Sequence, residues 1–388
     1  MASIQSITAR KILNSRGEWT VEVNLVCEDF GVIASVPEGK SKGKFEALSI
    51  DAEEAVKIIN KKISPALKSF NPEDQNGVDN ALIELDGTPN KSVFGANSML
   101  AVSIAAARAA ARAKNVPLWK YIGGMGKRIS KAPDLFMNVI NGGLHAGNSL
   151  DFQEYIIIPK AETIIQNIEL GTRVYLELGK ELLDQFGKGA TLVGDEGGYA
   201  PNFENNLQPF ETINTVLAKL DLGDKFNFGL DAAASNVKKS ANDLNREYES
   251  LLTNYNLKYL EDPFDENDFD SFAGFLANHG SKCLIAGDDL TVTNAEKMTS
   301  ARDKKSVNAV IIKPNQIGTI TEALYAVAKA QEFGWKIVVS HRSGETNDDF
   351  IADFAYGVGA DGFKLGAPVR GERTAKYNRL IAIEKEAA

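Results

Sequence analysis

FNFGLD (226–231) opens a series of six short apolar runs, and this series decides the fold. The others are LKYLED (257–262), CLIAGDD (283–289), NAVIIK (308–313), KIVVSH (336–341) and DGFK (361–364). Each run finishes on a polar or charged residue, and these ends recur every 23 to 30 residues. An interval of that size holds a loop and a helix, which is the rhythm of consecutive βα units.

Two further strand candidates, LFMNVI (135–140) and EYIIIP (154–159), bring the number of predicted strands to eight. The length of segment 133–388 is close to the ~250 residues typical of a β/α barrel. A doubly wound open sheet is the competing architecture, and it predicts a glycine-rich phosphate loop after its first strand. GGMG (123–126) and GGLHAG (142–147) do not match that fingerprint and are typical of turns.

The first part of the chain has a different pattern. Short β-branched segments at 3–12, 19–27 and 30–37 predict strands, and helical patterns follow them. The predicted helices cover 51–68, 76–85 and 97–114. Strands followed by helices favour an α+β arrangement. We therefore predict an α/β chain with a small α+β capping domain (1–125), a linker around 124–133 and a catalytic β/α barrel (133–388).

Composition excludes several classes of protein. Lys and Arg total 43 against 52 Asp and Glu, for a formal charge of −9, so nucleic acid is not expected as the primary ligand. The longest apolar stretch, 101–113, is interrupted by Arg108 and Arg112, so no membrane span is expected. The first residues lack the apolar core of a signal peptide, and only Cys27 and Cys283 are present. These features favour the cytoplasm.

Three consecutive strand ends are acidic, namely Asp231, Glu261 and Asp288. In a β/α barrel these ends point into one mouth, where three carboxylates would repel each other unless a cation lay between them. Oxygen ligands without a Cys/His cluster suit Mg²⁺ or Mn²⁺. Any one acid alone would be interpreted as a helix cap, but three in series favour a metal site. Neighbouring acids are expected to act as caps or supports for these ligands: Asp262, Asp265 and Asp289.

The next three strand ends are basic or can become so: Lys313, His341 and Lys364. A lysine beside a dication and a second ammonium loses its proton more easily, so we expect a lowered pKa and a base. Arg342 and Ser343 follow His341 at once and suit a phosphate or carboxylate.

The three acidic strand ends form an acidic arc and the three basic ones a basic arc, and two such arcs that face each other predict one reaction class. The metal binds a substrate carboxylate, a lysine removes the proton α to it, and the metal stabilises the resulting charge. If a group then leaves, a general acid is needed. GDEGG (194–198) offers Glu196 on a glycine-rich turn, although a plain loop acid is the simpler interpretation of that motif alone.

With these residues in view, the chain resembles the enolase family over nearly its whole length. The matching stretches are NSRG (14–17), NVINGGLHAG (138–147), QE (153–154), GDEGG (194–198), GLD (229–231), EDPF (261–264), DDLTVTN (288–294), KPNQIGT (313–319), SHRSGET (340–346) and KLGAP (364–368). Enolase-type sites, with a Lys or His base and Mg²⁺ on an ene-diolate, are themselves a standard example of this chemistry.

The resemblance implies a cytoplasmic, homodimeric lyase, phosphopyruvate hydratase. It would interconvert 2-phospho-D-glycerate and phosphoenolpyruvate in glycolysis and gluconeogenesis with two Mg²⁺ ions, the second arriving with the substrate. By the same resemblance, Lys313 is the catalytic base and Glu196 the catalytic acid, with Glu154 and His145 beside the leaving hydroxyl. The implied substrate contacts are Gln153, His341, Arg342, Ser343 and Lys364. The implied metal ligands are Asp231, Glu261, Asp288 and Ser41.

The chain departs from the family most clearly in one loop. The family usually has a sequence close to PSGASTG, where this chain has PEGKSKG (37–43). Its lysines are expected to affect the second metal site and loop closure rather than the reaction type. Two alternatives stay open: another α-proton-abstracting enzyme of the wider superfamily, or a catalytically impaired enolase that acts as a binding protein.

Overall fold

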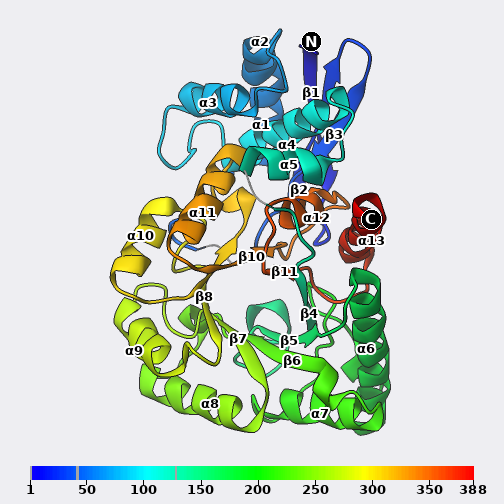
Figure 1. Ribbon diagram of the computed structural model, residues 1–388, viewed down its shortest axis with the longest axis vertical. Helices are drawn as coiled ribbons and strands as arrows, with labels where there is room; N and C mark the ends of the chain where they lie inside the picture. The colour runs from blue at the N-terminus through cyan, green and yellow to red at the C-terminus, as the bar shows by residue number, and fades with distance from the viewer. Residues whose placement is uncertain (1, 41–42, 127–128) are drawn as a thin grey trace.

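The computed structural model describes residues 2–40, 43–126 and 129–388, which form a small N-terminal part above a larger barrel (Figure 1). The strands are β1 (Ile4–Leu13), β2 (Trp19–Cys27), β3 (Gly31–Ser35), β4 (Asp134–Asn141), β5 (Glu154–Pro159), β6 (Phe226–Asp231), β7 (Leu257–Glu261), β8 (Leu284–Gly287), β9 (Ala309–Ile312), β10 (Lys336–Ser340) and β11 (Gly362–Lys364). Within those ranges, no helix combines the length and the apolar character needed to cross a bilayer.

The α-helices are α1 (Ala52–Ile58), α2 (Ser64–Leu67), α3 (Gln75–Asp86), α4 (Ala96–Ala113), α5 (Leu118–Gly126), α6 (Ile164–Phe186), α7 (Gln208–Lys219), α8 (Ala241–Asn254), α9 (Phe269–His279), α10 (Ala295–Asp303), α11 (Ile320–Glu332), α12 (Phe350–Gly357) and α13 (Gly371–Ala387). Shorter turns of other helix types are η1 (Ile59–Ile63), η2 (Gly143–His145), η3 (Lys188–Thr191), η4 (Gly223–Lys225), η5 (Ala234–Asn236) and η6 (Pro314–Gln316).

The N-terminal part contains the predicted strands and helices. β1, β2 and β3 form an antiparallel sheet in chain order. Helix α4 packs on β2 and β3, and its alanines allow close approach to the sheet because they carry no bulk beyond Cβ. The predicted linker is partly wrong, because α5 continues to Gly126 and so occupies its first residues.

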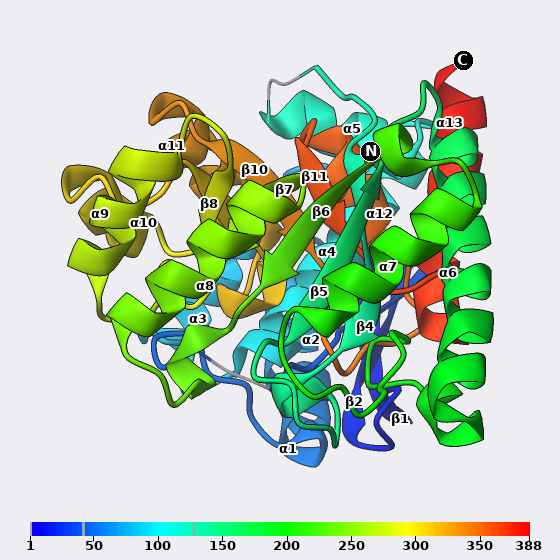
Figure 2. The same cartoon turned by 90° about the horizontal axis from the view of Figure 1, so that it is seen from below.

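In the described part of the chain, eight strands close a barrel in the order β10-β11-β4-β5-β6-β7-β8-β9. This closure excludes the doubly wound open sheet. The helices that follow the barrel strands lie outside them (Figure 2). One strand reverses direction: β5 is antiparallel to both β4 and β6. The connection from β4 to β5 contains only the short turn η2 and no crossover helix, so a parallel return is not available.

The barrel interior is filled by side chains of unequal size. Phe136 and Tyr259 meet edge to face with ring centroids 4.7 Å apart. Gly229 and Gly362 make room for them, since a Cβ built on Gly229 would lie 3.2 Å from Tyr259 and one on Gly362 only 2.7 Å from Phe136. Large rings opposite glycines therefore fill this barrel without strain.

Replacing Gly362 by alanine is expected to destabilise the protein by about 1–3 kcal/mol, because the new methyl group overpacks the interior against Phe136. The control is Gly274→Ala on the exposed side of α9, where nothing lies within 4 Å and alanine should stabilise the helix by about 0.5–1 kcal/mol. Denaturant unfolding of both variants measures the difference. Equal stability of the two would show that the interior repacks freely.

The N-terminal part is fastened to the loop that follows β10. The Ser35 backbone N–H donates to Asp348 Oδ2 at 2.9 Å, and Arg108 of α4 donates to both carboxylate oxygens of Asp348 at 2.7 and 2.9 Å. Glu38 and Gly344 form an isolated antiparallel bridge. These contacts hold the segment after β3 across the end of the barrel at which β10 finishes.

Candidate active site

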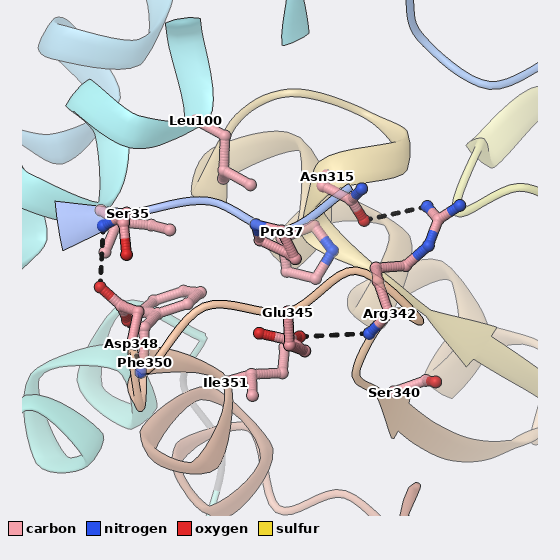
Figure 3. A pocket seen from close by; sticks show the side chains of 12 residues that line it. Ser35, Pro37, Leu100, Asn315, Ser340, Arg342, Glu345, Asp348, Phe350 and Ile351 are labelled. Atoms are coloured by element: carbon pink, nitrogen blue, oxygen red, sulfur yellow. Dashed lines mark hydrogen bonds between the residues drawn. The ribbon is translucent and has the colours of Figure 1, made fainter. Parts of the chain in front are cut away.

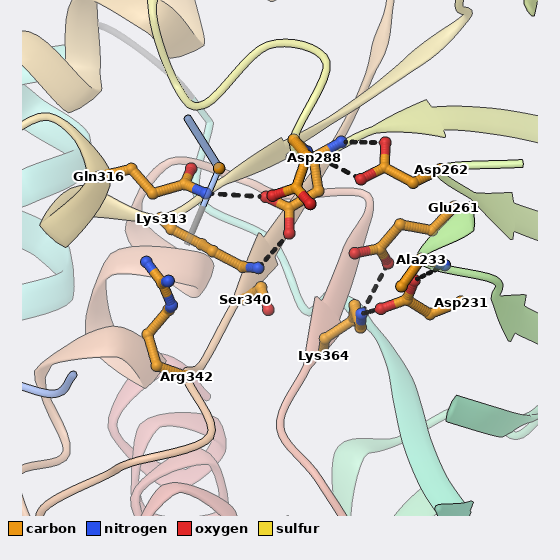
Figure 4. Close-up of polar contacts among 12 residues, drawn as sticks. Asp231, Ala233, Glu261, Asp262, Asp288, Lys313, Gln316, Ser340, Arg342 and Lys364 are labelled. Atoms are coloured by element: carbon orange, nitrogen blue, oxygen red, sulfur yellow. Dashed lines mark hydrogen bonds and ion pairs between the residues drawn. The ribbon is translucent and has the colours of Figure 1, made fainter. Parts of the chain in front are cut away.

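Three carboxylates lie at neighbouring strand ends, as the sequence predicts (Figure 4). Asp231 ends β6, Glu261 ends β7 and Asp288 directly follows β8, and all three are buried. The ammonium of Lys364, the last residue of β11, donates to Asp231 Oδ2 at 3.0 Å and to Glu261 Oε2 at 2.6 Å. It also donates to Glu154 Oε1 at 3.2 Å. The acidic residues and Lys364 therefore converge in one buried cluster.

Glu154 reaches this cluster because β5 runs against its neighbours. It is the first residue of β5 and pairs with Asp231, the last residue of β6. The preceding residue, Gln153, donates through Nε2 to Asp231 Oδ2 at 3.4 Å. The reversal thus brings the start of a strand to the same mouth as the ends of its neighbours.

The cluster has surplus negative charge and unused acceptors. Burial and the nearby Asp231 carboxylate raise the pKa of Glu261 to about 8, although Lys364 opposes the shift. Three buried oxygens of this cluster accept no hydrogen bond from any described residue: Glu261 Oε1, Glu154 Oε2 and Gln153 Oε1. A hard divalent cation would satisfy such oxygens and remove the repulsion, so the residues present fit one.

The tightest acidic groupings, however, differ from the predicted trio. In the ranges that the structure describes, ligand atoms within 4.8 Å of one another belong to His145, Glu154 and Glu196, and to Asp262, Asp288 and Asp289. Lys364 and Lys313 lie against the carboxylates of the trio. The assignment of Asp231, Glu261 and Asp288 as the metal ligands therefore stays a prediction.

Asp262 orients the loop that carries Asp288. Its two carboxylate oxygens accept the backbone N–H groups of Asp288 at 2.9 Å and Asp289 at 2.8 Å. Asp262 itself has a φ of +41°, a conformation that a non-glycine residue adopts only when its surroundings hold it there. The predicted role of Asp262 as a support for the acidic arc agrees with these contacts.

Lys313, directly after β9, forms an ion pair with Asp288 Oδ2. Gln316 Nε2 donates to the other oxygen of Asp288 at 2.9 Å (Figure 4). Burial disfavours the charged lysine, but the carboxylates of Asp288 and Glu261 together outweigh it and raise the pKa of Lys313. The expected lowering of this pKa depends on a dication beside the lysine, so it stays a prediction for the metal-bound site.

A second group of buried residues surrounds Glu196 on the GDEGG turn. Asn138 Nδ2 donates to Glu196 Oε2 at 3.0 Å. Nδ1 of His145 lies 3.4 Å and Nε2 of His341 lies 3.6 Å from Glu196 Oε1. Ligand atoms of Glu154, Glu196 and His145 lie within 4.8 Å of one another. Glu196 therefore faces one amide and two imidazoles, with a second carboxylate beside it.

The two carboxylates of this group differ in their affinity for a proton. Burial and the nearby Glu196 charge raise the pKa of Glu154 well above its ordinary value. Burial also acts on Glu196, but His145 and His341 outweigh it and hold the pKa of Glu196 well below its usual range. Two carboxylates this close titrate as a pair, and their shared proton resides mainly on Glu154.

Two family models match the chain, one described as the enolase N-terminal domain over residues 4–122 and one as the enolase C-terminal TIM barrel domain over residues 130–388. The chain belongs to the enolase family. It is 42% identical over 406 residues to a protein named enolase from Methanocaldococcus jannaschii, covering 99% of this chain and 95% of that one. A Methanopyrus kandleri enolase is 42% identical over 416 residues (100% and 97%), and a Solanum lycopersicum enolase 41% identical over 426 (100% and 96%).

These full-length relatives, all named enolase, support phosphopyruvate hydratase, a lyase, as the enzyme class of this chain. The predicted family and the β/α barrel with its smaller N-terminal domain are confirmed. Enolase relatives also imply a divalent metal and a phosphorylated carboxylate substrate. Ser41, the predicted ligand of a second metal, lies outside the described residues.

Two predicted anion contacts of this enolase-family chain have partners within the protein. Arg342 donates to both carboxylate oxygens of Glu46, at 3.0 and 3.1 Å, and to Asn315 Oδ1 at 3.1 Å. The Ser343 hydroxyl accepts the backbone N–H of Lys40 at 2.8 Å. Glu46 thus shows that this arginine can hold a planar anion through a fork.

Lys40, one of the charges that distinguish this loop from the enolase pattern, contacts the GDEGG turn. Its ammonium lies 3.4 Å from Asp195 Oδ2, where Arg16 also forms an ion pair. Lys40, Asp195, His145 and Arg370 line an open pocket of about 840 Å³. This pocket reaches the Glu196 group through His145 and is large enough for a small phosphorylated acid.

Arg342 also lines a second, smaller cavity (Figure 3). It has a volume of about 30 Å³ and includes Leu100, Phe350 and Ile351 in its lining, together with the Glu345 side chain. This space suits one or two water molecules at most. Of these two spaces, the open pocket beside Lys40 and His145 is the one large enough for a small phosphorylated acid.

Several residues of the site escaped the sequence analysis. Asn138 and Gln316 lie inside two of the enolase motifs, so the motifs themselves could have indicated that these residues belong to the site. Glu46 and Arg373 gave no such signal, because each meets its partner only through the tertiary fold. Polar residues inside a functional motif could therefore have been predicted from the sequence, whereas partners distant in the sequence could not.

Stability should fall between pH 6.5 and 4 through His341. Burial lowers the pKa of His341 to about 4, and the Arg373 guanidinium adds to the shift, although Glu196 opposes it. Since the unfolded chain then binds the proton more tightly, this contribution is complete above about pH 6.5 and is lost as pH falls toward 4. The loss is about 3 kcal/mol at 1.36 kcal/mol per pKa unit.

Denaturant unfolding at several pH values checks this expectation. His341→Gln should show a smaller loss of stability on acidification than the wild type, because it has no group to charge. His279→Gln is the control, since His279 lies outside the site and pairs with Glu249 at 3.3 Å. Parallel stability curves for wild type and His341→Gln would contradict the assignment.

Proposed function

We propose that this protein catalyses the reversible dehydration of 2-phospho-D-glycerate to phosphoenolpyruvate with Mg²⁺, in glycolysis and gluconeogenesis. One observation carries the proposal: an acidic arc of strand ends faces Lys313 and Lys364 across one buried mouth. Membership of the enolase family supports the same substrate class. Acidic and basic groups at one centre suit abstraction of a proton α to a metal-bound carboxylate.

Asp231, Glu261 and Asp288 would hold the first Mg²⁺, and Ser41 would contribute to a second that arrives with the substrate. The unsatisfied Oε1 of Glu261 and the raised pKa of that residue support this assignment. Bound there, the metal supplies positive charge that offsets these carboxylates and stabilises the charge developing on the substrate carboxylate. Lys364, which contacts Asp231 and Glu261, would help to orient that carboxylate.

Lys313 takes the proton from C2 of the substrate. Among the described residues its ammonium pairs with one carboxylate, that of Asp288, whereas the Lys364 ammonium pairs with three. Neutralising Asp288 would remove the contact that raises the pKa of Lys313. The lysine can then serve as a base near neutral pH.

The Glu154–Glu196 pair supplies the proton for the departing C3 hydroxyl. A carboxyl whose pKa is raised by burial and a neighbouring charge keeps a proton at neutral pH, as Glu154 does. Glu196 was predicted as the acid, and it would deliver the shared proton after exchange with Glu154. His145 and Gln153 border the same space and contact the leaving group.

Arg342, Ser343 and His341 would bind the phosphate. The Arg342–Glu46 fork supports this role, because phosphate oxygens can replace a carboxylate in the same geometry. Binding of substrate then requires Glu46 to give up or share the guanidinium.

The test mixes purified protein with 2-phosphoglycerate and Mg²⁺ and follows the conjugated product by ultraviolet absorbance. Product should form, should stop when a chelator removes the metal, and should resume when Mg²⁺ is restored. A folded, Mg²⁺-binding protein that forms no product would overturn the proposal. Activity on a different α-hydroxy or amino carboxylate would instead identify another α-proton-abstracting enzyme of the superfamily.

Family membership supports two further properties, a cytoplasmic location and a homodimer. The predicted base, acid and metal ligands are all present in the sequence, which argues against impairment. Measurement of the mass in solution by light scattering tests the dimer independently of activity.

A further inference from the structure

Arg373, on α13, is completely buried and contacts two loops of the site. Its Nη1 lies 2.6 Å from His341 Nδ1 and donates to the Arg342 carbonyl oxygen at 2.6 Å. Its Nη2 donates to the carbonyl oxygens of Ser343 at 2.6 Å and Asp195 at 3.1 Å. One guanidinium therefore joins the loop after β10 to the GDEGG turn.

The contact with His341 fixes the position of a proton. A guanidinium is always protonated and can only donate, so His341 Nδ1 must accept and carries no hydrogen. The single ring proton of neutral His341 then lies on Nε2. That nitrogen is 3.6 Å from Glu196 Oε1, so the N–H faces the carboxylate. The opposite tautomer would bring two donors together at Nδ1.

We infer that Arg373 is a positioning residue, which holds His341 as its Nε2–H tautomer so that this N–H faces Glu196 while the same guanidinium ties together the two loops that carry them. The consequence for catalysis rests on the proposed function. Asn138 donates to the other oxygen of Glu196 at 3.0 Å, and the histidine presents a second N–H toward the same carboxylate at 3.6 Å. Partners that orient a metal-ligating imidazole are worth about 10- to 100-fold in activity, and we expect an effect of the same order for His341.

The chain offers a matched control on the same helix. Lys376 is also a completely buried cation of α13, and it donates to Glu345 Oε2 at 2.8 Å and to the Thr346 carbonyl oxygen at 2.7 Å. It supports the same loop after β10 without contacting His341. Replacement of Lys376 therefore shows the effect of removing a buried cation that supports this loop but does not contact His341.

The test uses the substrate-free full chain with ¹⁵N-labelled histidine, whose three imidazoles give a simple nuclear magnetic resonance spectrum. Wild-type His341 should show hydrogen on Nε2 only. Arg373→Met should show His341 as a mixture of the two tautomers. The same variant should lower kcat about 10- to 100-fold, with a smaller change in KM. Arg373→Lys, which keeps a donor, should retain the tautomer and recover part of kcat. Lys376→Met should retain the tautomer.

Hydrogen on Nδ1 in the wild type would overturn the inference. An unchanged tautomer in Arg373→Met, or an equal change in Lys376→Met, would also overturn it. Because the spectrum needs no substrate, a protein that shows the expected tautomers but no activity on 2-phosphoglycerate supports the positioning role while it refutes the proposed function.

Discussion

Lys313→Ala is expected to lower kcat for the dehydration of 2-phosphoglycerate by about 10²- to 10⁴-fold, the range that a positioned general base contributes. The reason is geometric. Lys313 is the lysine that meets the acidic arc at Asp288, and among the described residues the cations near it either pair with several carboxylates or cannot lose a proton. Neither Lys364 nor Arg342 can replace it as a base.

Isotope exchange separates this step from the rest. If Lys313 removes the C2 proton, exchange of that proton with solvent should disappear together with turnover, while Mg²⁺ still binds. Lys329→Ala is the control, because Lys329 lies on α11 and pairs with Glu332 at 2.8 Å, outside the site. Normal C2 exchange in Lys313→Ala would assign the base to another residue.

Lys364→Met is expected to destabilise the metal-free protein by about 3–5 kcal/mol, the cost of leaving buried charge without its partner. Three carboxylates, from Glu154, Asp231 and Glu261, lose one shared ammonium. Added Mg²⁺ should restore much of the loss if it binds among the same oxygens, since binding to the folded state alone raises stability. Thermal unfolding with and without Mg²⁺ measures both effects.

Lys91→Met is the matched comparison. Lys91 is a buried lysine outside the site that pairs with Glu322 at 2.8 Å. Its removal should also destabilise the protein, but Mg²⁺ should not rescue it more than it stabilises the wild type. Equal rescue of both variants, or none of Lys364→Met, would place the metal elsewhere.

The parts of the fold that could be predicted from the sequence are those that depend on short, continuous segments. Each strand end from Asp231 to Lys364 follows its own apolar run, so the barrel and its charged rim follow from short segments. The reversal of β5 was missed, although the missing helix between β4 and β5 is visible in the sequence. The apolar pattern of EYIIIP is the same in either direction, because the periodicity of a strand does not show which way the strand runs.

Distant pairings and charge states could not be predicted in the same way. Arg342 and Glu46 are 296 residues apart, and no local pattern links them. The sequence assigned Asp288 to a metal, and it could not show that the same carboxylate pairs with Lys313 and raises the pKa of that lysine. A titration depends on every neighbour of a group, and most neighbours are set by the tertiary fold.

The placement of Lys364 on β11 also bears on how the chain folds. Closure of the barrel joins β11 to β4, which starts at Asp134, so this pairing spans most of the barrel sequence and carries a high contact order. Until β11 docks, the carboxylates of β5, β6 and β7 have no ammonium among them. The closing strand thus delivers the counter-charge of the site, and a barrel closed in a shifted register would be penalised by uncompensated repulsion. In this way the electrostatics of the site help to select the correct closure of the barrel during folding.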